Sequence, residues 1–208
     1  MAPAPARRSL YSPHPGLKMI QSSMRLLQQR TGRSAEEWAA ITEQEGPEGV
    51  PARREWLKAA HGFTTNYASL IADLSAGEGL ADMDPDAYLQ AAEGYVEAMF
   101  SGRRAALRPA YDRLLALAFT LGKDVKACPG KTIVPLYRQH VFAQIKPSTN
   151  TRIDLGLALG DVKPAGRLTD TGGLAKKDRI THRIPISAPD DIDADIRRWL
   201  KKAYDGDG

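Results

Sequence analysis

Basic side chains and a few carboxylates recur along short apolar runs in the second half of the chain. Between residues 123 and 187 there are twelve Lys or Arg and five Asp, a local net charge of +7, although the whole chain carries only +4. Such an excess of cations favours a partner with negative charge. The chemistry expected here is therefore the binding of an anion by ammonium and guanidinium groups.

Three of the runs alternate apolar and polar residues, as the strands of a half-buried sheet do. They span residues 139–146, 151–159 and 179–186. We expect their apolar faces to pack on helices and their polar faces to form one open surface, which Lys131 and Arg138 could join from strand ends. The residues expected on that open surface are Phe142, Gln144, Lys146, Arg152, Asp154, Thr181 and Arg183.

An aromatic ring among cations can bind single-stranded nucleic acid, because bases stack on the ring while the cations contact phosphates. Phe142 is the residue expected to provide that stacking. Asp154 is separated from Arg152 by one residue, which places both on one face of a strand. We expect the two to form an ion pair, and this interpretation is preferred to a general base.

Patterns for catalysis or metal binding are incomplete. Residues 130–132, Gly-Lys-Thr, look like the end of a phosphate-binding loop, but position 125 is Val where that motif requires Gly, and a strand follows. The histidines are scattered, and with a single cysteine, Cys128, we expect no metal site, no disulfide and no cofactor. His182 has the parity of Ile180 and Ile184, which favours a half-buried, hydrogen-bonded histidine over a catalytic one.

The composition is that of an ordinary globular protein, with 42% hydrophobic and 26% charged residues in 208. No apolar run approaches 18 residues, and the first 16 residues lack the apolar centre of a secretory signal. A single cysteine fits a reducing compartment. We therefore expect a cytoplasmic protein with no membrane segment.

The first half of the chain has the spacing of helices. Ser34 followed by Glu37 predicts a capping box, and Gly62 marks the end of a helix that begins near Pro51. This helix and the next, about 65–74, have the outline of a helix-turn-helix. The second of them carries no Lys or Arg and one Asp, so helix packing is expected there in preference to DNA binding.

These patterns predict an α+β fold with a helical N-terminal unit and a C-terminal antiparallel β-sheet packed on helices. Residues 1–12 are expected to be a disordered tail, 13–75 a helical domain and 76–85 a linker rich in Gly and acidic residues. Residues 86–208 are expected to form an α+β domain. Its predicted elements are two helices, four to five strands and a C-terminal helix.

Several segments resemble a two-domain bacterial family. TGRSAEEW and WLKAAHGF resemble a short helical domain of unknown function, and PGKTIVPLYRQHVFAQIKP, TRIDLGLAL, ITHRIPI and DDIDADIRRWLKKAYD resemble the domain of unknown function that often follows it. The second domain is similar to segments attached to predicted nucleases and predicted transport proteins, and more distantly to YdhG-like α/β proteins. The resemblance implies a slight preference for nucleic acid. The resemblance also places seven residues on motif positions of the family, which are Lys131, Arg138, Arg152, Asp154, Arg167, His182 and Arg183.

We therefore expect a non-enzymatic binding module for an anionic ligand, with phosphate-rich nucleic acid as the first candidate and no oligomeric state assigned. One alternative is an enzyme for a small substrate, with a pocket between the sheet and loop 160–178 and with His182 and Asp154 as acid and base. Another is a protein-interaction adaptor. A deep pocket with converging polar groups would favour the enzyme, and a broad open basic face the binding module.

Overall fold

The computed structural model describes residues 9–79 and 83–208 and divides the chain into two compact units. One unit is Pro13–Ala91, and the other is Ala92–Gly208 together with the segment before Pro13. The division falls within one helix, α5 (Pro85–Met99). The predicted tail includes residues 1–8 and the predicted linker includes residues 80–82, which lie outside the described residues.

The N-terminal unit is helical. Its helices are α1 (Gly16–Thr31), α2 (Ala35–Glu45), α3 (Val50–His61), α4 (Thr65–Ser75) and the first part of α5. The predicted capping box is present at α2, where the Ser34 hydroxyl accepts the Glu37 N–H and the Glu37 carboxylate accepts the Ser34 N–H. At the end of α3, Gly62 adopts a left-handed conformation with φ of 67°, which glycine allows without strain.

Between α3 and α4, the basic side chain of Arg53 has a structural role. Its guanidinium donates to the backbone oxygen and the hydroxyl of Ser75, at 2.9 and 3.0 Å, and to the backbone oxygen of Pro47 at 3.1 Å. These bonds hold the C-terminal end of α4 to α3. The Arg53 guanidinium thus bonds within the pair formed by α3 and α4.

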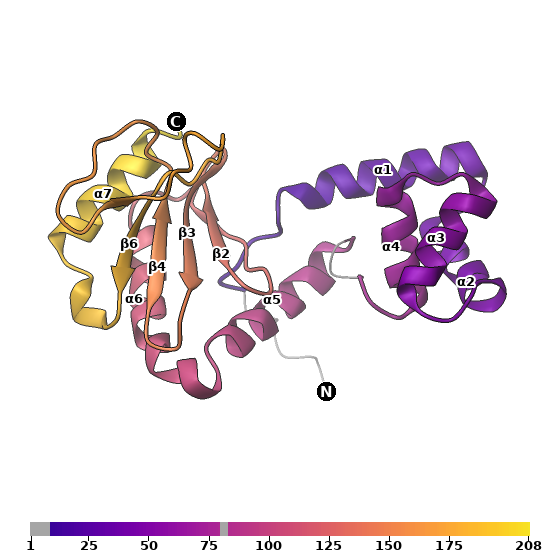
Figure 1. The fold of residues 1–208 in the computed structure, drawn as a ribbon, viewed down its shortest axis with the longest axis horizontal. Coiled ribbons are helices and arrows are strands. Elements are labelled where there is room, and N and C mark those ends of the chain that lie inside the picture. The colour runs from indigo at the N-terminus through magenta and orange to yellow at the C-terminus, as the bar shows by residue number, and fades with distance from the viewer. Residues whose placement is uncertain (1–8, 80–82) are drawn as a thin grey trace, which may run out of the picture. The chain divides into compact units, whose positions relative to one another are not determined.

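The C-terminal unit is a sheet with helices on one face (Figure 1). Its helices are the end of α5, the 3₁₀-helices η2 (Gly102–Leu107) and η3 (Pro189–Asp191), α6 (Arg108–Phe119) and α7 (Ala194–Asp205). Its strands are β1 (Lys126–Ala127), β2 (Val134–Tyr137), β3 (Val141–Pro147), β4 (Ile153–Leu157), β5 (Thr169–Asp170) and β6 (His182–Ile186). All neighbours are antiparallel, in the order β1-β2-β3-β4-β6-β5.

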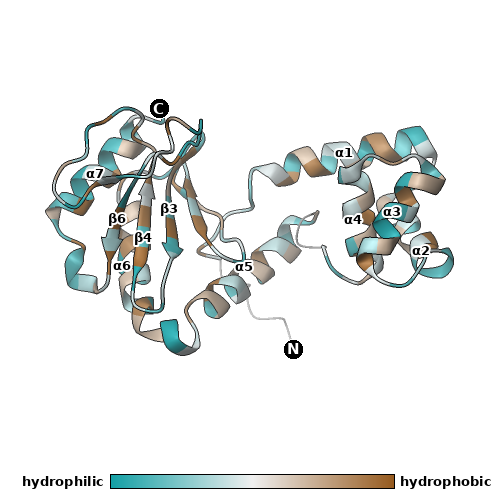
Figure 2. Cartoon of the chain, viewed as in Figure 1, coloured by the Kyte–Doolittle hydropathy of each residue, from teal (hydrophilic) through white to brown (hydrophobic). Residues whose placement is uncertain are grey.

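The predicted α+β class, with a helical N-terminal region and an antiparallel sheet, is confirmed. The sheet has six strands where four to five were expected, because β1 and β5 are only two residues long and so show no alternation in the sequence. Helix α7 presents hydrophilic residues on its outer side (teal in Figure 2) and buries Ile196, Trp199 and Leu200. Among the described residues, no helix has the length and apolar character needed to cross a bilayer.

The middle strand β4 sets the two faces of the sheet. Ile153, Leu155 and Leu157 belong to the core shared with α6 and α7. Asp154 therefore lies on the opposite face, where it is opposite Lys146 of β3 and Pro185 of β6. We call this opposite side the open face.

Phe142 does not lie on the open face, so this part of the predicted surface is wrong. Leu136 pairs with Ala143 and Tyr137 with Val141, so Phe142 is the extra residue of a β-bulge between β2 and β3. A bulge changes the direction of a side chain relative to strict alternation. The Phe142 ring is 0% exposed and meets the Tyr204 ring of α7 edge to face, with centroids 5.6 Å apart.

We predict that Phe142→Ala destabilises the protein by about 3–5 kcal/mol, because it removes a fully buried ring and leaves a cavity. Urea unfolding of the full chain measures the change. Gln144→Ala on the same strand is the control, since Gln144 is only half-buried and its loss should cost less than about 1 kcal/mol. A Phe142→Ala protein as stable as this control would contradict the core position of the ring.

Candidate anion-binding site

A hollow of about 300 Å³ lies on the open face over the ends of β3, β4 and β6. It brings together Lys146, Arg152, Asp154 and Arg183 of the predicted site. We call it the open-face hollow. Its lining residues are Gln144, Lys146, Ser148, Arg152, Asp154, Gly156, Thr171, Ile180 and Arg183.

Asp154 is the centre of this hollow. The Arg152 Nε lies 2.9 Å from Asp154 Oδ1, as an ion pair without the angle of a hydrogen bond. The Arg183 Nη1 donates to Oδ2 at 3.2 Å. The ion pair expected between Asp154 and Arg152 is therefore present, with Arg183 as a second partner from the neighbouring strand.

The arginines are partly exposed while the carboxylate is not. The exposed fraction of the side chain is 39% for Arg152 and 49% for Arg183, but 12% for Asp154. A carboxylate at this depth requires nearby cations. The hollow contains three cations, Lys146, Arg152 and Arg183, and one carboxylate, Asp154. Its net charge is therefore positive, which favours an anionic ligand.

Gly156 brings the lining side chains of the hollow close to the β4 backbone. Gly156 lies opposite Gln144 and Arg183 in the sheet, and a Cβ added there would come within 2.7 Å of the Gln144 side chain and 2.8 Å of the Ile180 side chain. A larger residue at position 156 would force these neighbours to shift. Glycine therefore lets the Gln144 and Ile180 side chains pack directly over the β4 backbone.

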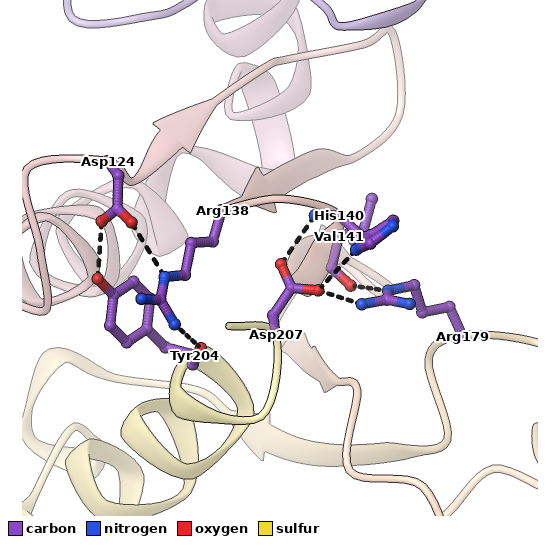
Figure 3. A network of polar contacts seen from close by, with 7 residues as sticks. All are labelled: Asp124, Arg138, His140, Val141, Arg179, Tyr204 and Asp207. Carbon is purple, nitrogen blue, oxygen red and sulfur yellow. Dashed lines mark hydrogen bonds and ion pairs between the residues drawn. The ribbon is translucent and has the colours of Figure 1, made fainter.

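Arg138 has a structural role away from the hollow (Figure 3). Its Nε donates to Asp124 Oδ2 at 3.0 Å, its Nη1 donates to the backbone oxygen of Tyr204 at 3.3 Å, and it lies over the Tyr204 ring. The Tyr204 hydroxyl donates to Asp124 Oδ1 at 2.7 Å. The Tyr204 hydroxyl and the Arg138 guanidinium lower the pKa of Asp124. This group joins α7 to the segment before β1 and to the β2–β3 turn.

Lys131 and Arg167 do not line the open-face hollow either. Lys131 is exposed in the turn before β2. One Arg167 nitrogen, Nη2, donates to both carboxylate oxygens of Asp193 at 2.7 Å, and Nη1 donates to the backbone oxygen of Asp191 at 2.9 Å. Arg167 thus ties the loop before β5 to the start of α7, where Asp193 is the N-cap.

His182 is buried, which is deeper than the expected half-buried position. It is 2% exposed, its Nδ1 contacts the Thr181 hydroxyl at 2.9 Å and its Nε2 contacts the backbone oxygen of Val162 at 2.7 Å. It lies opposite Leu157, a residue of the helix-covered face. Because His182 and Asp154 belong to opposite faces of the sheet, they cannot act as acid and base on one substrate.

Apart from Gly156, which has no side chain, three residues of the hollow were not expected from the sequence. Ser148 follows β3 and Thr171 follows β5, both outside the alternating part of a strand. Ile180 precedes β6, and its parity with Ile184 placed it on the apolar face. The first backbone hydrogen bond from this segment to β4 is donated by the Thr181 N–H to Leu157 O. The regular alternation of β6 therefore does not extend back to Ile180.

The described residues hold no group of three or more His, Cys, Asp or Glu side chains placed to bind a metal ion. The nucleophile of greatest intrinsic reactivity, Cys128, is 1% exposed. Burial raises the pKa of its thiol to about 12. A thiol with this pKa is almost wholly protonated near neutral pH, and therefore is a poor nucleophile.

Comparison with family models assigns both halves of the sequence. A model described as a domain of unknown function (DUF5655) matches residues 96–206, more than half of the chain. The chain belongs to the DUF5655 family. A second model, a domain of unknown function (DUF4287), matches residues 20–76. The expected succession of two such domains is confirmed, and the DUF5655 match contains the whole open-face hollow. Neither the curated proteins nor the solved structures gave a match.

We predict that Cys128 of the DUF5655 domain resists alkylation while the protein is folded. With a pKa of about 12 against about 8.5 in an unfolded chain, its thiolate fraction at pH 8 falls on the order of a thousandfold. Iodoacetamide labelling followed by mass spectrometry measures the rate, and the same protein in urea is the control. Equal rates in the two states would contradict the buried, protonated thiol.

Proposed function

We propose that the open face of the DUF5655 domain binds the phosphate groups of a nucleic acid through Lys146, Arg152 and Arg183. The observation that carries this proposal is the convergence of three cations on a hollow that contains one carboxylate. Phosphate groups are the anions that a nucleic acid presents in a row. A basic surface without deep enclosure fits such a ligand.

Asp154 contributes to the proposed binding by fixing the arginines. A guanidinium has five N–H donors in a planar fork, and contacts with Asp154 use one or two of them on each arginine. The remaining donors are available to oxygen atoms of a ligand. A guanidinium that is already ordered loses less conformational entropy when it binds.

The core position of Phe142 changes the expected mode of binding. None of the described residues that line the open-face hollow is aromatic, so the proposal includes no stacking of bases there. Contacts with phosphates alone carry little sequence information and depend strongly on salt. We therefore propose binding with weak sequence preference.

The resemblance to domains attached to predicted nucleases also supports nucleic acid over other phosphate compounds. A cytoplasmic bacterial protein, as expected from the sequence, would meet such a ligand. The enzyme alternative loses its proposed acid and base because His182 is buried with both ring nitrogens in contact with oxygen atoms. We propose no second function for the open face.

We predict that Lys146→Ala and Arg183→Ala each weaken binding to a single-stranded oligonucleotide by about tenfold, the loss expected for one charged contact. Each should also lower the slope of log K against log salt by about 0.7. Fluorescence anisotropy of a labelled oligonucleotide at several salt concentrations measures both quantities. Arg183→Ala leaves Asp154 paired with Arg152.

Lys131→Ala is the matched control, because it removes the same charge from an exposed position outside the hollow. It should change affinity and slope much less than the two test variants. An equal effect of all three variants would show a general charge effect and refute the specific site. No binding of any oligonucleotide by the parent protein would refute the function.

A further inference from the structure

A second hollow of the C-terminal unit lies next to the C-terminal end of α7 and has a volume of about 460 Å³. We call it the α7 hollow. Its charged lining residues are Asp178, Arg179 and Lys202, and its larger apolar ones are Leu159 and Leu174. We propose that the α7 hollow binds a small molecule in which an anionic group, a carboxylate or a phosphate, is attached to an apolar body.

The anionic group is assigned by the way in which Arg179 is held. Its Nε donates to the backbone oxygen of Val141 at 2.7 Å, and its Nη2 donates to Asp207 Oδ1 (Figure 3). The side chain nevertheless remains 46% exposed. One edge of the guanidinium is thus fixed, and donors on the other edge are available for planar recognition of a carboxylate or phosphate.

Asp207 is well suited to fix this arginine. Its side chain is 1% exposed, and it also accepts the backbone N–H of His140 at 2.8 Å and contacts the His140 Nδ1 at 3.2 Å. Several donors therefore compensate the burial of its charge. Because these partners come from the β2–β3 turn, the position of Arg179 is tied to the sheet.

Lys202 supplies a second cation to the α7 hollow, and Asp178 supplies one carboxylate. Asp178 already accepts the Ile180 N–H through Oδ1 at 3.1 Å. The lining residues carry a net charge of +1, and the buried Asp207 behind Arg179 brings the sum to zero. The anionic group is therefore assigned by the exposed guanidinium edge of Arg179 and not by an excess of charge. An uncharged or cationic ligand would leave the exposed donors of Arg179 without a partner.

The apolar body is assigned by leucines from two segments. Leu174 is one of the few large apolar side chains of the described chain that are exposed, at 55%, and Leu159 lies across the same hollow. Burying the exposed side chain against a ligand removes apolar surface from water. The combination of a fixed arginine and an apolar wall distinguishes this hollow from the open-face hollow, whose nine lining residues include one aliphatic residue, Ile180.

Octanoate, octyl phosphate and octanol serve as probes, with binding followed by isothermal titration calorimetry on the full chain. We expect the two anions to bind and octanol to bind at least tenfold more weakly, because it lacks the charge that Arg179 and Lys202 would meet. The comparison of octanoate with octyl phosphate identifies the preferred anionic group. Octanol binding as tight as octanoate binding would overturn the proposal.

Lys202→Gln and Leu174→Asp test the two parts of the hollow without breaking the Arg179–Asp207 pair. Each should weaken octanoate binding by about tenfold. Their controls lie at exposed neighbouring positions outside the lining: Lys201→Gln makes the same change, and Ala175→Asp introduces the same negative charge without removing a leucine. Equal losses in test and control variants would overturn the site, as would the absence of octanoate binding to the parent protein.

Arg152→Ala separates this proposal from the proposed nucleic-acid function. It removes a cation from the open-face hollow and none from the α7 hollow. Octanoate binding should therefore be unchanged within about twofold, since distant exposed charges are screened. A tenfold loss in this variant would place octanoate in the open-face hollow and overturn the assignment to the α7 hollow.

Discussion

A carboxylate on a wholly buried strand is the constraint that organises the open face. All five residues of β4 are buried, and four of them have no charge to solvate. Asp154 does, and an isolated carboxylate in such a place would be costly. The cost is offset by Arg152 on the same strand and by Arg183 on the next, so the position of Asp154 determines where both guanidinium groups lie.

The same physical arrangement recurs at a second place in the unit. Asp207 holds Arg179 as Asp154 holds Arg183, with a buried carboxylate and an arginine that remains about half exposed. Such a pair contributes little to stability by itself, because desolvation of the carboxylate opposes the attraction. Its effect is to order a long side chain that would otherwise sample many rotamers. Ordered cations at the rim of a hollow are useful for binding.

The sequence predicted what depends on local pattern. Alternation placed Asp154, Lys146 and Arg183 on one face correctly, since a period of two holds along β4, β6 and most of β3. Alternation failed at Phe142, because a bulge depends on how two strands pair and cannot be recognised from the sequence of one strand alone.

Arginines with a structural role could not be told apart, from the sequence, from those proposed to bind a ligand. Arg138 and Arg167 look the same as Arg183 in the sequence, because all three are arginines within the same basic region. The partners of Arg138 are Asp124 and Tyr204, and that of Arg167 is Asp193. These partners are brought near by α7 and the loops. The Arg179–Asp207 pair joins residues 28 positions apart. No spacing rule for a helix or strand links such a pair, so it emerges only when the C-terminal helix is docked.

The segment just before β6 separates the two hollows. Ile180 lines the open-face hollow, while Arg179 and Thr181 on either side of it line the α7 hollow. One short segment thus contributes side chains to both hollows. The segment is fixed by the bond from Thr181 N–H to Leu157 O and by the Arg179–Asp207 pair. A ligand in either hollow would therefore meet a wall that the sheet and α7 already hold in place.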